Sequence, residues 1–390
     1  MMREVKSFFC RRLFTPTERL EDVLVEIRQG RIASLRTDAQ SFACGLHAST
    51  LNAAPGFVDL HIQGCGGFDF LDATPEAVRT IRSMALAAGC TSLLATTTFE
   101  AGPEGLPHLE RIVNAVREGS QGSGGSRILG IHLEGPYLNI ERKGGFGVQY
   151  FRTPDRDEFL RVLEITGNDL KMITLAPEMN GALEIMQEAL SRGIVVSLGH
   201  SIAGYEQARA AFDAGASQLT HVFNAMNGLH HREPGLLGAA LEDDHVFVQL
   251  IPDGIHIHPA VMKILHRIKG SRRICLISDA TAPCGLKDGT VVQGVGGRIK
   301  ISNGAVRLED GTLAGSALLM DEAVRGMNRL TEIPLRDALI MASRTPAKAI
   351  GFAKEIGSVL PGMQADFVLF DDDLHIHYVI LEGNLHSIGE

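Results

Sequence analysis

The sequence lacks paired cysteines, an excess of positive charge and any apolar run of membrane-spanning length. Its cysteines are scattered without a C-x-x-C pair, so neither a zinc knuckle nor a disulfide framework is indicated. The formal net charge of −9 argues against a general surface for nucleic acid or for an anionic membrane. The N-terminal segment MMREVKSFFCRRLF has no apolar region of signal-peptide length. We therefore expect a cytoplasmic protein with reduced thiols that binds neither nucleic acid nor a membrane. The six cysteines are Cys10, Cys44, Cys65, Cys90, Cys275 and Cys284.

What the chain does contain is a repeated order of strand, loop and helix. Its 390 residues, of which 45% are hydrophobic and 21% charged, are enough for one large α/β barrel with a small appendage. Eight short apolar runs, several of them ending in a polar residue, predict a (β/α)8 barrel of the TIM type. The predicted strands are Gly56–Gln63, Thr91–Thr97, Arg127–Glu134, Lys171–Pro177, Ile194–His200, Ser217–His221, His245–Asp253 and Arg273–Asp279.

Amphipathic helices are predicted between most of these strands, and two more after the last one. The later two are expected at Ser316–Leu330 and Leu335–Ile350. Strand patterns are predicted at both ends of the chain, including a hairpin pattern in VLVEIRQGRIASLRT. We therefore expect residues 1–54 and 352–390 to form a small β-sandwich domain together, and residues 55–351 to form the barrel.

Two histidines follow neighbouring predicted strands at equivalent positions. His200 lies in LGHS and His221 in THVFNAM, with a predicted helix, Tyr205–Phe212, between them. In a parallel barrel, residues just past the carboxyl ends of the strands converge on one rim. This repetition favours a pair of metal ligands over two histidines with purely structural roles.

Two carboxylates complete the pattern at other strand ends. Glu134 closes the third predicted strand in ILGIHLEGPY and supplies the third ligand of a catalytic metal site. Asp279 closes the eighth strand in RICLISDAT and is a candidate general base for water, with a helix N-cap as the alternative role.

The first predicted strand carries D-x-H-x-Q at Asp59, His61 and Gln63, close to the D-x-H-x-H entry signature of the amidohydrolase superfamily. Further motifs follow in order over nearly the whole chain: HLEGPYLN, LGHS, THVFNAMN, REPGLLG, PDGIHI, ISDAT, TLAGSALLMDEAVR and GSVLPGMQADF. With these motifs, the sequence resembles N-acetylglucosamine-6-phosphate deacetylases.

The resemblance implies hydrolysis of an N-acetyl group from an amino sugar phosphate. It implies one divalent metal ion per chain, with zinc favoured and iron, manganese or cobalt as alternatives, held by Glu134, His200 and His221, and Asp279 as the acid and base. It also implies a homodimer in which Arg232 reaches the neighbouring site and binds the sugar phosphate with His256. The implied substrate-binding residues are Asn224, Ala225, Arg232, Asp253, His256, Leu313, Ala314 and Gly315.

Two departures from the family pattern bear on this prediction. Gln63 replaces the second histidine of H-x-H, which favours a mononuclear site with His61 and Gln63 near the metal or its water. In the loop after Glu134, where family members have a histidine over the reacting group, this chain has Phe146 after Gly145. A phenyl ring cannot donate a hydrogen bond to an oxyanion. Either Gln149 or another group replaces the histidine, or the substrate differs.

Two alternatives therefore stay open. One is a related amidohydrolase that acts on another amide, such as N-acetylgalactosamine 6-phosphate, an unphosphorylated N-acyl sugar or a cyclic amide. The other is a barrel without catalytic activity that serves binding or assembly, since fold does not fix function.

Overall fold

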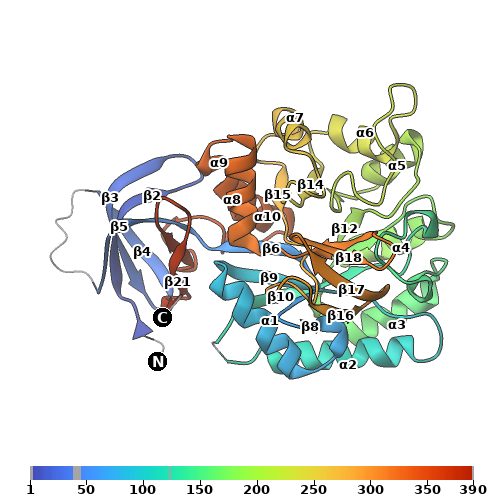
Figure 1. The fold of residues 1–390 in the computed structure, drawn as a ribbon, viewed down its shortest axis with the longest axis horizontal. Coiled ribbons are helices and arrows are strands. Elements are labelled where there is room, and N and C mark those ends of the chain that lie inside the picture. The colour runs from blue at the N-terminus through green and yellow to red at the C-terminus, as the bar shows by residue number, and fades with distance from the viewer. Residues whose placement is uncertain (1–2, 38–44, 123, 389–390) are drawn as a thin grey trace.

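The computed structural model describes residues 3–37, 45–122 and 124–388, so Cys44 lies outside the described residues. Its centre is a sheet of eight parallel strands in the order β15-β14-β13-β12-β11-β10-β9-β6. The two edge strands meet through a parallel bridge between Ile62 and Ala280, and Asp279 N donates to His61 O over 2.8 Å. The predicted TIM-type barrel is therefore confirmed (Figure 1).

All eight barrel strands coincide with predicted ones, although most are shorter. Their side chains are buried on both faces, which is expected where helices cover the outside and packed side chains fill the inside. The strands are β6 (Phe57–Ile62), β9 (Cys90–Thr97), β10 (Arg127–Glu134), β11 (Leu170–Leu175), β12 (Val195–Leu198), β13 (Gln218–Leu219), β14 (Phe247–Leu250) and β15 (Ile274–Leu276).

Helices surround this sheet and turn apolar stripes toward it. They are α1 (Pro75–Ala87), α2 (Gly105–Gly119), α3 (Arg156–Thr166), α4 (Ala182–Ser191), α5 (Tyr205–Asp213), α6 (Gly235–Glu242), α7 (Pro259–Lys269), α8 (Met320–Thr331), α9 (Leu335–Ala342) and α10 (Arg344–Ala349).

The last two predicted helices need correction. The helix expected from Ser316 begins only at Met320, because β19 (Leu313–Ser316) occupies the residues before it. The helix expected over Leu335–Ile350 is interrupted at Ser343, whose φ of −130° is not helical. Pro346 accounts for the new start, since a proline without an N–H fits the first turn of α10 but not the interior of one long helix.

The two ends of the chain share a second eight-stranded sheet, here called the terminal sheet. Figure 1 shows it beside the barrel, with blue N-terminal strands next to red C-terminal ones. It is one continuous hydrogen-bonded sheet that curls around its own apolar core, which refines the expected sandwich. Its strands are β1 (Arg3–Glu4), β2 (Ser7–Phe14), β3 (Arg19–Arg28), β4 (Arg31–Arg36), β5 (Leu46–Pro55), β20 (Phe367–Phe370), β21 (Ile376–Leu381) and β22 (Asn384–Ser387). The domain division at residues 1–54 plus 352–390 and 55–351 stays a prediction.

A close connection joins the terminal sheet to the barrel. Only Gly56 separates β5 from β6, and a Cβ atom there would lie 2.2 Å from Thr91 Oγ1, so the backbone crossing excludes a side chain. Arg127, at the start of β10, donates to the buried carboxylate of Asp366 over 3.1 Å. The two sheets are thus held together by chain continuity and by a largely buried ion pair.

A third sheet lies at the carboxyl end of the barrel. It is antiparallel, in the order β16-β17-β18-β19. Its strands are β16 (Val291–Gly294), β17 (Gly297–Ser302), β18 (Ala305–Leu308) and β19 (Leu313–Ser316). A parallel bridge from Ala280 to Ser316 anchors β19 just beyond the eighth barrel strand, so this sheet flanks the barrel mouth.

Candidate metal centre and active site

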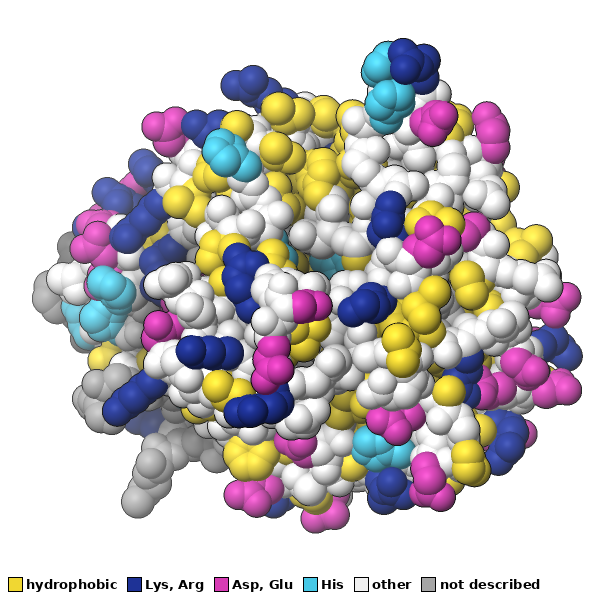
Figure 2. Space-filling model, turned by 45° about the vertical axis from the view of Figure 1, so that its right-hand side comes forward, with side chains coloured by type: hydrophobic (Ala, Val, Ile, Leu, Met, Phe, Trp, Pro, Cys, Tyr) yellow, Lys and Arg dark blue, Asp and Glu magenta, His cyan; other side chains and the backbone are white. Residues whose placement is uncertain are grey.

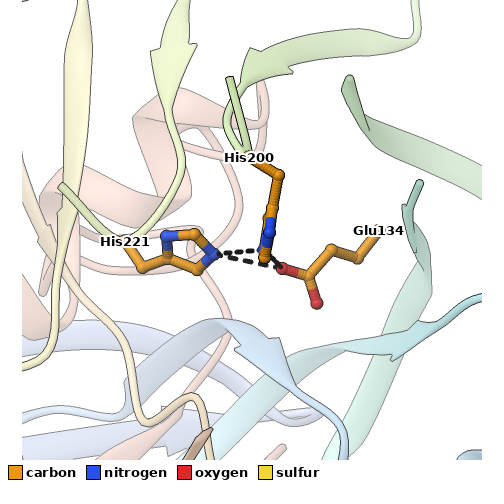
Figure 3. Close-up of side chains that lie close together, drawn as sticks. All are labelled: Glu134, His200 and His221. Carbon is orange, nitrogen blue, oxygen red and sulfur yellow. Dashed lines mark hydrogen bonds and ion pairs between the residues drawn. The ribbon is translucent and has the colours of Figure 1, made fainter. Parts of the chain in front are cut away.

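Three predicted ligands converge at the barrel mouth: Glu134, His200 and His221. Their candidate ligand atoms all lie within 4.8 Å of one another, and all three side chains are buried. His221 Nε2 lies 3.0 Å from His200 Nε2 and 3.2 Å from Glu134 Oε1. Figure 3 shows the two rings and the carboxylate pointing toward one common point. The structure therefore places these residues together as the sequence predicts.

The local backbone explains how strand ends deliver these side chains. Glu134 is the last residue of β10, whereas His200, His221 and Asp279 follow β12, β13 and β15 by a few residues. Those three residues have positive φ angles of 46°, 26° and 48°. Residues other than glycine rarely adopt this left-handed backbone conformation, and those that do are concentrated at functional sites. The turn after each strand thus carries backbone strain that aims a polar side chain into the mouth.

The donor set fits a divalent metal ion. His200 Nδ1 donates to Arg142 O over 2.7 Å, which leaves the Nε2 lone pair free for a ligand bond. Ligand atoms around one tetrahedral zinc lie about 3.3–3.5 Å apart, given metal–ligand distances of about 2.0–2.2 Å. The three observed separations of 3.0, 3.2 and 3.3 Å are close to that spacing. Two imidazoles and one carboxylate with room for water form a typical catalytic metal site.

His61 and Gln63 contact the second oxygen of Glu134. Gln63 Nε2 donates to Glu134 Oε2 over 2.8 Å, and His61 Nε2 lies 3.1 Å from the same oxygen. The first oxygen, Oε1, faces His200 and His221. These contacts fix the carboxylate so that one oxygen is directed at the ion position.

Asp279 lies next to this network. Its Oδ1 is 3.2 Å from His61 Nε2, and burial together with the charge of Glu134 raises the Asp279 pKa. Burial alone would lower the pKa of His61, but Glu134 and Asp279 outweigh it and raise that pKa to about 9. Asp59 instead supports the backbone, accepting from His61 N over 3.1 Å. Asp279 thus lies beside the candidate metal ligands and in direct contact with His61.

A cavity of about 400 Å³ opens above these residues, within the range for a small-molecule site. It brings together most of the predicted site residues: Gln63, Glu134, Gly145, Phe146, His200, His221, Asn224, Ala225, His256, Asp279, Leu313, Ala314 and Gly315. Sequence reasoning missed several other lining residues: Asp69, Gly144, Thr281, Gly294, Val295, Ile299, Arg307 and Thr312. Five of these eight, from Gly294 to Thr312, belong to the four-stranded sheet or its turns, where TLAG is the one recognised motif.

Several residues named from the sequence lie outside the cavity lining, among them His61, Arg232, Asp253 and Gln149. Arg232 is exposed and donates to His231 Nε2 over 2.7 Å. Asp253 lies behind His256 and accepts from its Nδ1 over 2.6 Å, which leaves Nε2 of His256 for a ligand. Gln149 is exposed, so it does not take the place of the family's histidine.

Phe146 forms an apolar wall beside the metal ligands. Its ring packs edge-on against His200 with centroids 5.3 Å apart, and it shares a small buried cluster with Leu138 and Tyr150. Gly145 approaches so closely that a Cβ atom would lie 2.8 Å from Ala314 Cα. The loop therefore holds the phenyl ring against His200 and excludes water from that side of the cavity.

Comparison with known proteins agrees with this geometry. The model of the amidohydrolase family matches residues 52–386, and the chain belongs to this family. Among curated relatives, N-acetylgalactosamine-6-phosphate deacetylase of Escherichia coli O157:H7 is 36% identical, covering 97% of this chain and 98% of the relative. N-acetylglucosamine-6-phosphate deacetylase of Vibrio furnissii is 35% identical, and the match covers 94% of this chain and 91% of the relative.

A solved structure extends the likeness to the whole fold. A mutant of N-acetyl-D-glucosamine-6-phosphate deacetylase from Mycobacterium smegmatis, in complex with N-acetyl-D-glucosamine-6-phosphate, is 33% identical to this chain. The match has a TM-score of 0.91 and covers 98% of this chain and 99% of that one. Within the amidohydrolase family, the chain is thus a relative of the amino sugar phosphate deacetylases.

Proposed function

We propose that this protein hydrolyses N-acetylglucosamine 6-phosphate to glucosamine 6-phosphate and acetate. The observation that carries the proposal is the convergence of Glu134, His200, His221 and Asp279 on one cavity. Full-length relatives with this activity in their names support it. The intact ligand set also argues against a catalytically silent barrel.

Glu134, His200 and His221 would hold one divalent metal ion per chain, with zinc favoured and iron, manganese or cobalt as alternatives. When bound, such an ion lowers the pKa of water toward neutrality and polarises the carbonyl of the amide. Metal analysis of the purified protein, with about one ion per chain expected, identifies the element and tests the stoichiometry.

Asp279 moves the proton in this mechanism. Its carboxylate accepts a proton from the attacking water and later donates it to the departing amine, so that one water molecule yields acetate and the free amino sugar. His61, 3.2 Å from Asp279 Oδ1 and also in contact with Glu134, orients the carboxylate between the two events. Phe146 keeps bulk water away from the reacting carbonyl but donates no hydrogen bond to it.

The polar groups at the other side of the cavity would bind the sugar phosphate. Asn224, Ala225 and His256 line it, and Asp253 orients the His256 ring through Nδ1. The exposed position of Arg232 supports a role in the neighbouring site of a homodimer. Mixing inactive Asp279→Asn and Arg232→Gln subunits tests this role, because mixed dimers regain one complete site if Arg232 acts across the interface.

A second candidate substrate is N-acetylgalactosamine 6-phosphate. It is favoured by the 36% identity to the Escherichia coli relative of that name over nearly the whole chain. The two sugars differ only in the configuration of one hydroxyl group, so the same metal site and proton transfer serve both.

We place the reaction in the cytoplasm. All five described cysteines are buried free thiols, which suits a reducing compartment. In the part of the chain that the structure describes, no helix combines the length and apolar character needed to cross a membrane.

The decisive experiment measures acetate release from both N-acetylhexosamine 6-phosphates and from unphosphorylated N-acetylglucosamine. A higher kcat/KM on N-acetylglucosamine 6-phosphate than on the other two supports the proposal, and preference for the galactosamine compound selects the second candidate. Absence of release by metal-loaded protein contradicts both. A Phe146→His variant run in parallel tests whether a restored hydrogen-bond donor raises kcat.

A further inference from the structure

Arg307 is a cationic residue in the cavity wall that belongs to none of the recognised motifs. It lies on β18 of the four-stranded sheet, directly opposite Leu313 of β19, which also lines the cavity. Its side chain is half-buried, whereas its neighbour Val306 points to the opposite face and is fully buried in the core of that sheet. Ile299 and Ala314, which belong to the same apolar cluster as Val306, also line the cavity, so this wall combines apolar side chains with the Arg307 side chain.

The guanidinium has unused hydrogen-bonding capacity. One nitrogen, Nη1, donates to Gly311 O over 2.8 Å, which holds the side chain along the β18–β19 turn. Within the described ranges, no carboxylate oxygen lies within the 4.0 Å that defines an ion pair with Arg307. Its neighbour Arg298, on the same sheet, is by contrast 3.8 Å from Glu309. An arginine at a cavity wall without an acidic partner is suited to an anionic ligand.

The charge balance of the cavity strengthens this argument. The other ionisable side chains in the lining are the carboxylates Asp69, Glu134 and Asp279 and the histidines His200, His221 and His256. Arg307 is thus the one lysine or arginine in the lining formed by the described residues. Figure 2 shows the hollow, with histidine side chains at its floor and basic side chains beside its opening.

We propose that Arg307 is a specificity-determining residue that binds the phosphate of the substrate from within the same chain. The proposal rests on the proposed function and deepens it, because it adds a phosphate contact independent of Arg232 and of any second subunit. Arg307 provides directional N–H donors to a dianion, while His256 supplies a second donor from the barrel. Each chain then contributes to the preference for the phosphorylated sugar through a residue of its own.

The test compares Arg307→Gln with wild type on phosphorylated and unphosphorylated N-acetylglucosamine. We expect KM for the phosphorylated sugar to rise about 10- to 100-fold, as for a lost hydrogen bond to a charged group, with kcat nearly unchanged. On the unphosphorylated sugar, kcat/KM should stay at the wild-type value. Arg307→Lys should recover part of the lost affinity, since it keeps the charge and loses the fork of donors.

Lys300→Gln is the matched control. Lys300 pairs with Arg307 across β17 and β18 and lies on the same face, but it is exposed and outside the cavity lining. The Lys300→Gln variant removes the same charge from the same sheet. Because Lys300 lies outside the cavity, we expect KM to change by less than about threefold. Equal effects of the two variants would mean general electrostatic attraction and would overturn the proposal. Equal loss on both sugars after Arg307→Gln would also overturn it.

Failure of the proposed function is distinguishable from failure of this inference. Wild-type protein that releases acetate from neither sugar contradicts the proposed function alone. Calorimetric binding of glucosamine 6-phosphate and of inorganic phosphate then tests Arg307 directly. Binding weakened by Arg307→Gln and not by Lys300→Gln supports the inference, and binding equal to wild type in both variants refutes it.

Discussion

The barrel mouth and the terminal sheet bury their residues in opposite ways. The terminal sheet surrounds an apolar core in which Phe8 and Phe367, from opposite ends of the chain, pack edge-on with ring centroids 5.0 Å apart. The mouth instead buries carboxylates and imidazoles, several on backbone with positive φ. Buried charge and backbone strain cost stability, whereas apolar burial supplies it. This chain thus keeps the residues of its chemistry apart from the apolar core of the terminal sheet.

The largest expected effect is on the chemistry of the mouth. Asp279→Asn should lower kcat by about 10²- to 10⁴-fold, because the amide cannot accept the proton of water. We expect the metal content and the midpoint of urea unfolding to stay close to those of wild type. Turnover retained within tenfold would remove Asp279 from the proton-transfer role.

The opposite result is expected in the terminal sheet. Phe367→Ala should lower the free energy of unfolding by about 3–5 kcal/mol, since it removes a fully buried ring between the two chain ends. At a temperature where the variant is folded, kcat/KM should remain within about twofold of wild type. A large loss of activity in the folded variant would show that the terminal sheet also supports the site.

A smaller effect is expected from the residues that hold the metal ligand Glu134. Gln63→Leu keeps the approximate volume but removes the donor to Glu134 Oε2, and we expect metal affinity to fall about 10- to 100-fold. Competition with a chelator measures the change. Gln149→Leu is the control, because that glutamine is exposed and outside the cavity, and an equal effect there would exclude a specific role for Gln63.

The smallest effect concerns Asp69, a buried carboxylate in the cavity wall. Burial raises its pKa to about 7, with a further contribution from Asp72, although a hydrogen bond from Leu71 N opposes the shift. Because the folded pKa lies above the unfolded one, its contribution to stability declines as pH rises from about 4 to 7. The free energy of unfolding of Asp69→Asn should therefore exceed that of wild type by about 1 kcal/mol at pH 8, and by less at pH 5. Urea unfolding of both proteins at pH 5 and pH 8 measures this gain. An equal gain at the two pH values would contradict the prediction.

Much of the fold was predictable because its signals are local. The apolar runs with polar ends identified all eight barrel strands, and the polar strand ends together with the family resemblance named Glu134, His200, His221 and Asp279. The interrupted helix at Ser343 was not predicted, because the apolar pattern continues through it and only Pro346 signals the break. The continuous curl of the terminal sheet was also missed, since strand patterns do not specify which edges pair.

Periodicity and short motifs were enough to predict the class of fold, the candidate ligands at the strand ends and the family. The set of distant residues that share the cavity became clear from the folded chain alone. The tertiary structure placed Arg307 in the wall, left Gln149 outside and set Phe146 against His200. The physical reason is that cavity membership depends on how the four-stranded sheet and the loops close over the mouth. Those contacts join residues far apart in the chain and leave no periodic signal in it.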